Sequence, residues 1–138
     1  MLQPTLLSTW KDIEPWEEII FLHKIIIDRW SKYSITCLPL KDTDLVKKII
    51  KKNTTHKFYT KATHNIYAWR RREDWSIIEW KNDDGETWAG LCILRELKRA
   101  HFINWIIIVT RYYGWVKLQN DRFKHVIDAT KKLIQKIQ

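Results

Sequence analysis

The chain is poor in cysteine. Its 138 residues include only two, Cys37 and Cys92, which are far apart, form no C-x-x-C motif and each lie within an apolar segment. The five histidines do not fall at zinc-ligand spacing with them. Because free cysteine is among the most buried residue types, we interpret the pair as reduced thiols of the core and expect a cytosolic protein.

Long hydrophobic runs are also missing. No segment reaches the roughly 18 consecutive apolar residues that a membrane-spanning helix needs. Residues 1–20 include acidic side chains and Pro15, and they lack the basic leader and the apolar stretch of about 7 to 15 residues that mark a secretory signal. We therefore expect neither a membrane anchor nor export, and a cytoplasmic location.

Motifs of the common enzyme classes are absent. The sequence contains no H-E-x-x-H, P-loop, G-x-G-x-x-G or nucleophile elbow. An enzyme would have to assemble its site from distant residues, such as a hydrolase built on His64, Asp84 and His125. The acidic residues around Gly85 offer fewer oxygen ligands than a divalent-metal loop. We expect a protein that is not an enzyme, with no cofactor and no metal site.

The composition that is present favours one basic globular domain. Hydrophobic residues make up 45% of the chain, and we expect a single domain over residues 19–138 with an extension over residues 1–18. The 25 Lys and Arg against 16 Asp and Glu give a net charge of +9, which attracts polyanions and acidic protein surfaces. Nine tryptophans are many for this length, so some should lie at the surface.

Hydrophobic periodicity predicts the order of the elements. Residues 105–109 form an unbroken β-branched run, typical of a strand buried on both faces in the middle of a sheet, and a helix capped by Asn120 or Asp121 follows. Further strands are predicted at 19–28, 33–38, 61–70 and 75–80, and further helices at 43–53 and 87–101. This order predicts an α+β fold, a two-layer sandwich with a mixed sheet of about five strands and helices on one face.

The connection after the central strand concentrates cations and aromatic rings. Guanidinium and ammonium groups neutralise phosphates while rings stack on bases, and Arg, Tyr and Trp also dominate protein interfaces. Two interpretations stay open: a surface that binds a protein or a polyanion, and a structural loop whose rings cover the core. The candidate binding residues are Arg111, Tyr112, Tyr113, Gly114, Trp115, Lys117, Arg122, Lys124 and His125.

A second group of candidates lies earlier in the chain. The acids around Gly85 either close a strand and start the next helix, or they pair with Arg111 or Arg122 and fix the basic loop. The basic turn at 70–72 is a candidate extension of the same surface, and a histidine on a strand is commonly a hydrogen-bonded structural residue. This secondary group consists of His64, Asn65, Asp83, Asp84, Glu86, Arg70 and Arg71.

Three stretches together resemble one known family. They are Arg-Tyr-Tyr-Gly-Trp-Val-Lys-Leu-Gln-Asn-Asp-Arg-Phe-Lys-His (111–125), Ala-Thr-His-Asn-Ile-Tyr-Ala (62–68) and Asp-Asp-Gly-Glu-Thr-Trp-Ala-Gly (83–90). Their order is similar to the signature of the IMPACT family of translational regulators, whose domain also opens the bacterial YigZ-type proteins. The resemblance covers about residues 20–138. It implies a fold like the second domain of the small-subunit ribosomal protein five, here without the RWD domain of eukaryotic relatives.

The same resemblance implies a non-enzymatic regulator of translation in a stress response. Eukaryotic members restrain the kinase that phosphorylates a translation initiation factor during amino-acid starvation by competing for the activator of that kinase, and some bind actin. The expected partner is therefore a protein of that pathway, the kinase activator, with actin or the ribosome as further candidates. An RNA- or ribosome-binding basic module is the alternative. We expect no membrane partner and a monomer.

The basic loop departs from the pattern of this family at two positions. The family has Gly-Gly after the tyrosine and Gly-Pro before Asp-Arg-Phe, where this chain has Gly114-Trp115 and Gln119-Asn120. Glycine permits positive φ and close backbone approach, so tryptophan in its place predicts a change of loop shape. Asn120 tolerates left-handed conformations and caps helices, so the second change is milder.

Overall fold

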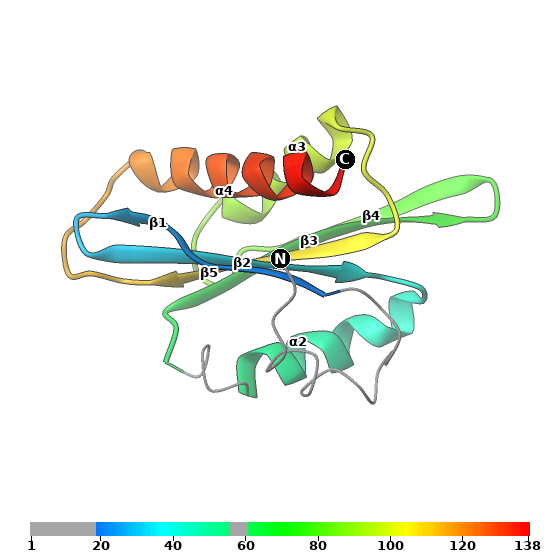
Figure 1. Ribbon diagram of the computed structural model, residues 1–138. Coiled ribbons are helices and arrows are strands. Elements are labelled where there is room, and N and C mark those ends of the chain that lie inside the picture. Colours follow the sequence, from blue (N-terminus) through cyan, green and yellow to red (C-terminus); the bar gives the residue numbers. More distant parts are fainter. Residues whose placement is uncertain (1–18, 56–60) are drawn as a thin grey trace.

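The predicted elements are all present in the computed structural model, which describes residues 19–55 and 61–138. The extension predicted at 1–18 lies outside the described residues. In chain order the elements are β1 (Ile20–Asp28), β2 (Ser31–Pro39), the 3-10 helix η1 (Thr43–Leu45), α2 (Val46–Thr55), β3 (His64–Glu73), β4 (Ser76–Asn82), α3 (Ala89–Arg99), β5 (Trp105–Tyr112) and α4 (Asp121–Ile137) (Figure 1). The α+β class with five strands is confirmed.

The sheet has the order β1-β2-β5-β3-β4. β5 lies in its middle, as the apolar run predicted, with Val109 opposite Ile35 on one side and Ile66 on the other. All the pairings are antiparallel, so the prediction of a mixed sheet is wrong. The reason is topological: β1 with β2 and β3 with β4 are hairpins, and β5 inserts between β2 and β3, the two neighbours that run in the same direction.

Helices cover both faces of the sheet. α3 and α4 lie on one face and α2 on the other (Figure 1), so the predicted two-layer sandwich with helices on one face is corrected to three layers. Alternate residues of β5 serve the two cores: Ile107 packs in the α3 and α4 core, and Ile108 packs in the α2 core with Ile49. A strand that is apolar at every position is stable only when both of its faces are covered.

The two cysteines are both free, and they differ in burial. Cys37 is fully enclosed in the α3 and α4 core, and this burial raises the pKa of its thiol well above the ordinary value. Its predicted place in the core is confirmed. Cys92 on α3 is only half-buried and packs at the margin of the same core.

The connections gather at the two ends of the sheet. At one end the β1–β2 turn, the start of β3, the β4–α3 connection and the β5–α4 connection meet, tied by hydrogen bonds such as Gly114 N to Ser31 Oγ at 3.2 Å and Asn65 N to Asp84 Oδ2 at 2.6 Å. At the other end the β3–β4 hairpin extends past the helices (Figure 1). Among the described residues no helix combines the length and the apolar character needed to cross a bilayer.

Candidate functional site

A cleft of about 460 Å³ opens where the connections meet. Four segments far apart in the chain contribute to it: the start of β3, the β4–α3 connection, the end of β5 and the first turn of α4 with the loop before it. The lining residues are Thr63, His64, Gly85, Glu86, Arg111, Tyr113, Lys117, Leu118, Gln119, Asn120 and Arg122. The cleft therefore collects cations, amides, a hydroxyl and a ring around one carboxylate.

That carboxylate, Glu86, organises the floor of the cleft. It is only 2% exposed and accepts a hydrogen bond from Nη1 of Arg111 at 2.5 Å and from Nη1 of Arg122 at 3.4 Å. Nε2 of His64 lies 3.9 Å away. Arg111 is itself 4% exposed, and a buried charge is tolerated only when it is paired and hydrogen-bonded. The predicted pairing of this acidic segment with Arg111 or Arg122 is confirmed, with both partners.

Asp83 and Asp84 have structural positions beside the cleft. Asp83 accepts hydrogen bonds from the amides of Trp88 at 3.0 Å and Gly90 at 2.8 Å, so it caps the start of α3 as the turn signal predicted. The carboxylate of Asp84 accepts a hydrogen bond from the backbone amide of Asn65. The backbone carbonyl oxygen of Asp84 contacts Nδ1 of His64 at 2.7 Å. These bonds hold the β4–α3 connection against β3.

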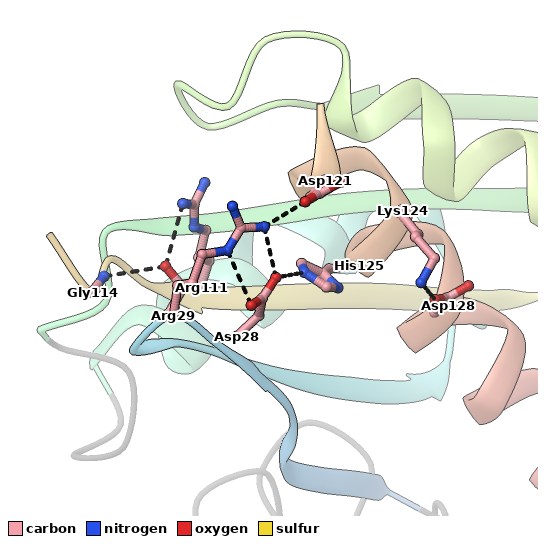
Figure 2. A network of polar contacts seen from close by, with 9 residues as sticks. Asp28, Arg29, Arg111, Gly114, Asp121, Lys124, His125 and Asp128 are labelled. Carbon is pink, nitrogen blue, oxygen red and sulfur yellow. Dashed lines mark hydrogen bonds and ion pairs between the residues drawn. The ribbon is translucent and has the colours of Figure 1, made fainter. Parts of the chain in front are cut away.

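A second polar network joins the β1–β2 turn to α4. Asp28 contacts Nε2 of His125 at 2.7 Å, and Arg29 bonds to both Asp28 and Asp121 (Figure 2). Hydrogen bonds from Arg29 and His125 lower the pKa of Asp28 from 3.8 to about 2. His125 is buried, in contact with Asp28 and with the ring of Tyr33, so its predicted place on the exposed basic surface is wrong.

The backbone of the β5–α4 connection takes unusual conformations. A Cβ on Gly114 would lie 2.2 Å from the carbonyl carbon of Trp30, so only glycine allows this close approach of two turns. Trp115 has φ 67° and Gln119 has φ 55°. These are the two positions at which the family pattern has a second glycine and the glycine before proline. Both residues therefore hold left-handed conformations, which glycine adopts without strain, and the change of loop shape expected from Trp115 stays a prediction.

The candidate residues separate into two groups, those at the cleft and those away from it. Arg111, Tyr113, Lys117 and Arg122 line the cleft together with His64 and Glu86. Tyr112 follows Arg111 in β5, so its side chain emerges on the opposite face of the sheet. Lys124 is exposed on α4 and pairs with Asp128 at 3.6 Å (Figure 2). The prediction of one continuous basic surface is therefore wrong for Tyr112 and for the buried His125.

Arg70 and Arg71 lie at the far end of β3. The β3–β5 register places His64 opposite Arg111 but Arg70 opposite Trp105, at the other end of β5. Six residues of strand separate the two positions by about 20 Å. Arg70 instead pairs with Glu79 at 3.2 Å, and Arg71 donates to the carbonyl of Leu40 at 2.9 Å. The predicted extension of the basic surface to this turn is wrong.

Sequence reasoning missed the rings and turns that complete this end of the molecule. Trp30 is 74% exposed in the β1–β2 turn, and the turn that carries Trp115, 87% exposed, packs against it through Gly114. The ring of Tyr113 contacts that of Trp115, with centroids 5.5 Å apart. A tryptophan in an otherwise polar tight turn was the available signal for Trp30, because such a position has no core to face.

The geometry does not assemble the hydrolase that the sequence left open. His64 and the backbone of Asp84 are in contact, but His125 bonds to Asp28 and is not among the residues that line the cleft. In the part of the chain that the structure describes, no group of three or more His, Cys, Asp or Glu side chains is arranged to hold a metal ion.

Fold and site together define a class of protein: a small antiparallel α+β domain with helices on both faces and a cationic, ring-bordered cleft at one end. Comparison with family models matches residues 29–134 to the Impact N-terminal domain. The chain belongs to this family.

Similar proteins occur among vertebrate sequences. The chain is 34% identical over 111 residues to Protein IMPACT of Rattus norvegicus, an alignment that covers 79% of this chain and 35% of the relative. It is 35% identical over 111 residues to Protein IMPACT of Xenopus laevis, covering 79% of this chain and 36% of the relative. The chain thus spans about a third of the length of these relatives.

Two solved structures share the fold. One is described as the two-domain translational regulator Yih1, with TM-score 0.55 and 26% identity over 84% of this chain and 46% of that one. The other is described as a hypothetical protein, with TM-score 0.67 and 15% identity over 85% of this chain and 57% of that one. The second likeness concerns the fold alone.

Proposed function

We propose that this protein is a non-enzymatic regulator of translation that binds a protein partner through the cleft end of the domain. The observation that carries the proposal is the arrangement of exposed tryptophans beside a cationic cleft on turns that are locked together. Trp30 and Trp115 project from touching turns, and Lys117 and Arg122 lie in the adjacent cleft. Exposed aromatic rings with arginine at their side are the residue types that supply most binding energy at protein interfaces.

Rigidity of the supporting turns favours this role. Glu86 forms ion pairs with Arg111 and Arg122, and Asp28 contacts His125. Gly114 packs so closely against the β1–β2 turn that no side chain would fit there. A surface that is ordered before binding loses little conformational entropy when the partner docks. The side chain of Arg122 is 36% exposed, so part of its guanidinium remains accessible to an acidic group of the partner.

The biological setting that we propose is the amino-acid-starvation response in the cytoplasm. The partner would be the activator of the kinase that phosphorylates a translation initiation factor, with actin as a further candidate. Family membership supports this assignment, as does the likeness to a structure described as a translational regulator. Because the chain spans about a third of the vertebrate relatives, the domain would perform only a part of what those longer proteins do.

The second candidate function is binding of RNA or the ribosome, which the net charge of +9 and the cleft cations favour. The two functions differ in how affinity responds to salt. Contacts to phosphates lower the logarithm of affinity by roughly 0.7 to 0.9 per contact for each tenfold rise in salt. A protein interface centred on exposed rings responds much less.

The test is binding of purified kinase activator and, separately, of a single-stranded RNA, measured by calorimetry at several salt concentrations. Trp115→Gly removes the ring and keeps a residue suited to φ 67°, and we expect it to weaken activator binding by about tenfold or more. Trp75→Ala is the matched control, because this ring is 99% exposed at the opposite end of the molecule. Equal affinity of the two variants would refute the cleft end as the interface, and a steep salt dependence with RNA alone would favour the second function.

A further inference from the structure

The outer edge of β4 is an uncovered strand edge with exposed apolar side chains. β4 is the last strand of the sheet, and among the described residues it pairs only with β3. Ile78 is 44% exposed and Trp80 is 59% exposed, although strand positions of this kind are usually half-buried. This edge lies away from the cleft and has no part in the function proposed above.

The two edges of the sheet are protected differently. On the β1 edge the register shifts between Leu22 and Ile26, around Lys24 with φ 50°, and such a bulge blunts an edge against further pairing. β4 pairs with β3 in an unbroken register and carries only Glu79 and Lys81 as charged residues. A regular edge of seven residues that includes Ile77, Ile78 and Trp80 is a template for another strand.

The register within the hairpin shows which backbone groups point outward. Glu73 pairs with Ser76 across a two-residue turn, so these two form the hydrogen-bonded closing pair. Pairs of this type alternate along the strands, which leaves the amides and carbonyls of Ile77, Glu79 and Lys81 on the open edge.

The edge is complementary to itself. When a second, antiparallel β4 is placed so that Trp80 faces Trp80 of the other copy, Glu79 of each copy lies opposite Lys81 of the other. In this register the outward-pointing amides and carbonyls of Glu79 in one copy meet those of Lys81 in the other, as an antiparallel ladder requires. It also places opposite charges directly across from each other and forms an aromatic cross-strand pair, both of which are stabilising.

We propose that two copies of this chain pair through their β4 edges and form a continuous sheet across a two-fold axis at Trp80. Only the tip of the hairpin extends past the helices (Figure 1), and the segment around Trp80 lies beside α3, where Lys98 contacts Glu79 at 3.3 Å. The interface is one strand edge, below the roughly 1,200 Å² of stable complexes, so the dimer is weak and concentration-dependent. This proposal revises the monomer expected from the sequence.

The test is sedimentation and light scattering of the full chain over a concentration series. We expect the mean mass to rise toward twice the chain mass. Lys81→Glu places like charges opposite each other at the edge and should weaken association at least tenfold, as should Trp80→Lys. Trp75→Lys adds a charge at the exposed hairpin tip, outside the paired segment, and should leave association unchanged. Circular dichroism checks that each variant is folded.

A cross-link tests the register. In a Cys92→Ser background, Trp80→Cys should form a disulfide-linked dimer on mild oxidation, because opposed residues of this pair type have Cα atoms about 4.5 Å apart. Ile77→Cys lies on the same edge but faces residue 83 of the other copy, so it should remain monomeric. A single-chain mass at every concentration, or equal cross-linking of both cysteine variants, would overturn the proposal.

Discussion

At the scale of single residues, the cleft depends on one buried acid. Glu86 brings Arg111 from the central strand and Arg122 from α4 to the same point, and His64 stands nearby. Nothing in the local sequence distinguishes Glu86 from Asp83 and Asp84, which serve a helix cap and a strand contact. Burial separates their roles, because only Glu86 faces a cation that is shut off from water.

Glu86→Gln should strongly destabilise the protein. The substitution leaves the guanidinium of Arg111 buried without a counter-charge, and loss of one partner of a buried ion pair costs about 3–5 kcal/mol. Urea unfolding monitored by tryptophan fluorescence measures the change. Asp128→Asn is the control, because its pair with the exposed Lys124 contributes about 0–1 kcal/mol. Losses of similar size in the two variants would contradict the role given to Glu86.

Gln119→Gly should stabilise the protein. Gln119 is exposed and has φ 55°, a left-handed conformation that costs a residue with a Cβ about 1–2 kcal/mol. Glycine removes this strain but gains entropy in the unfolded chain, so the expected net gain is about 0.5–1 kcal/mol. Gln119→Ala keeps the Cβ and should show no gain. The same urea titration compares the three chains, and equal effects of glycine and alanine would count against backbone strain.

At the scale of elements, the β1–β2 turn is fastened to the first turn of α4. Asp28 contacts His125, and Arg29 reaches Asp28 and Asp121 (Figure 2). These contacts join segments about ninety residues apart, as the separations of 97 and 92 positions show. They also fix the position of Trp30, whose turn supports Gly114.

This fastening should make stability depend on acid pH. The pKa of Asp28 is about 2 in the folded protein against 3.8 for the ordinary side chain. A lowered pKa means that the ionised form stabilises the fold above pH 3.8, and that this contribution is lost as the pH falls toward 2. The unfolding free energy of the wild type should therefore fall more steeply between pH 4 and pH 2 than that of Asp28→Asn. Parallel curves for the two proteins would exclude Asp28 as the source.

At the scale of the whole molecule, the two ends of the sheet have different chemistry. The end at which β5 finishes carries the cleft, its cations and the exposed rings of Trp30 and Trp115. The other end carries the β3–β4 hairpin, whose outer strand edge is open and bears the exposed Ile78 and Trp80. Under the two proposals, separate surfaces would let one copy hold a partner at the cleft while its β4 edge contacts a second copy.

The arrangement of layers depended on contacts that periodicity does not encode. The sequence predicted each helix and strand to within a few residues, but it placed all helices on one face of a mixed sheet. Periodicity identifies the apolar side of α2, with Val46 and Ile49, and does not say which face of the sheet that side covers. The face is set by β5. Ile107 is covered by α3 and α4, whereas Ile106 and Ile108 point to the other face of the sheet, and α2 covers them there.

The sequence by itself determined the α+β class, the central position of β5, and the presence of a cationic, aromatic connection after it, because periodicity and residue type act over a few neighbouring residues. Only the tertiary structure decided that Arg111 and His125 turn inward, that Tyr112 emerges on the other face, and that the turn of Trp30 packs against Gly114. Burial and pairing depend on partners 25 to 97 positions away along the chain, and only the folded sheet brings those partners within bonding distance.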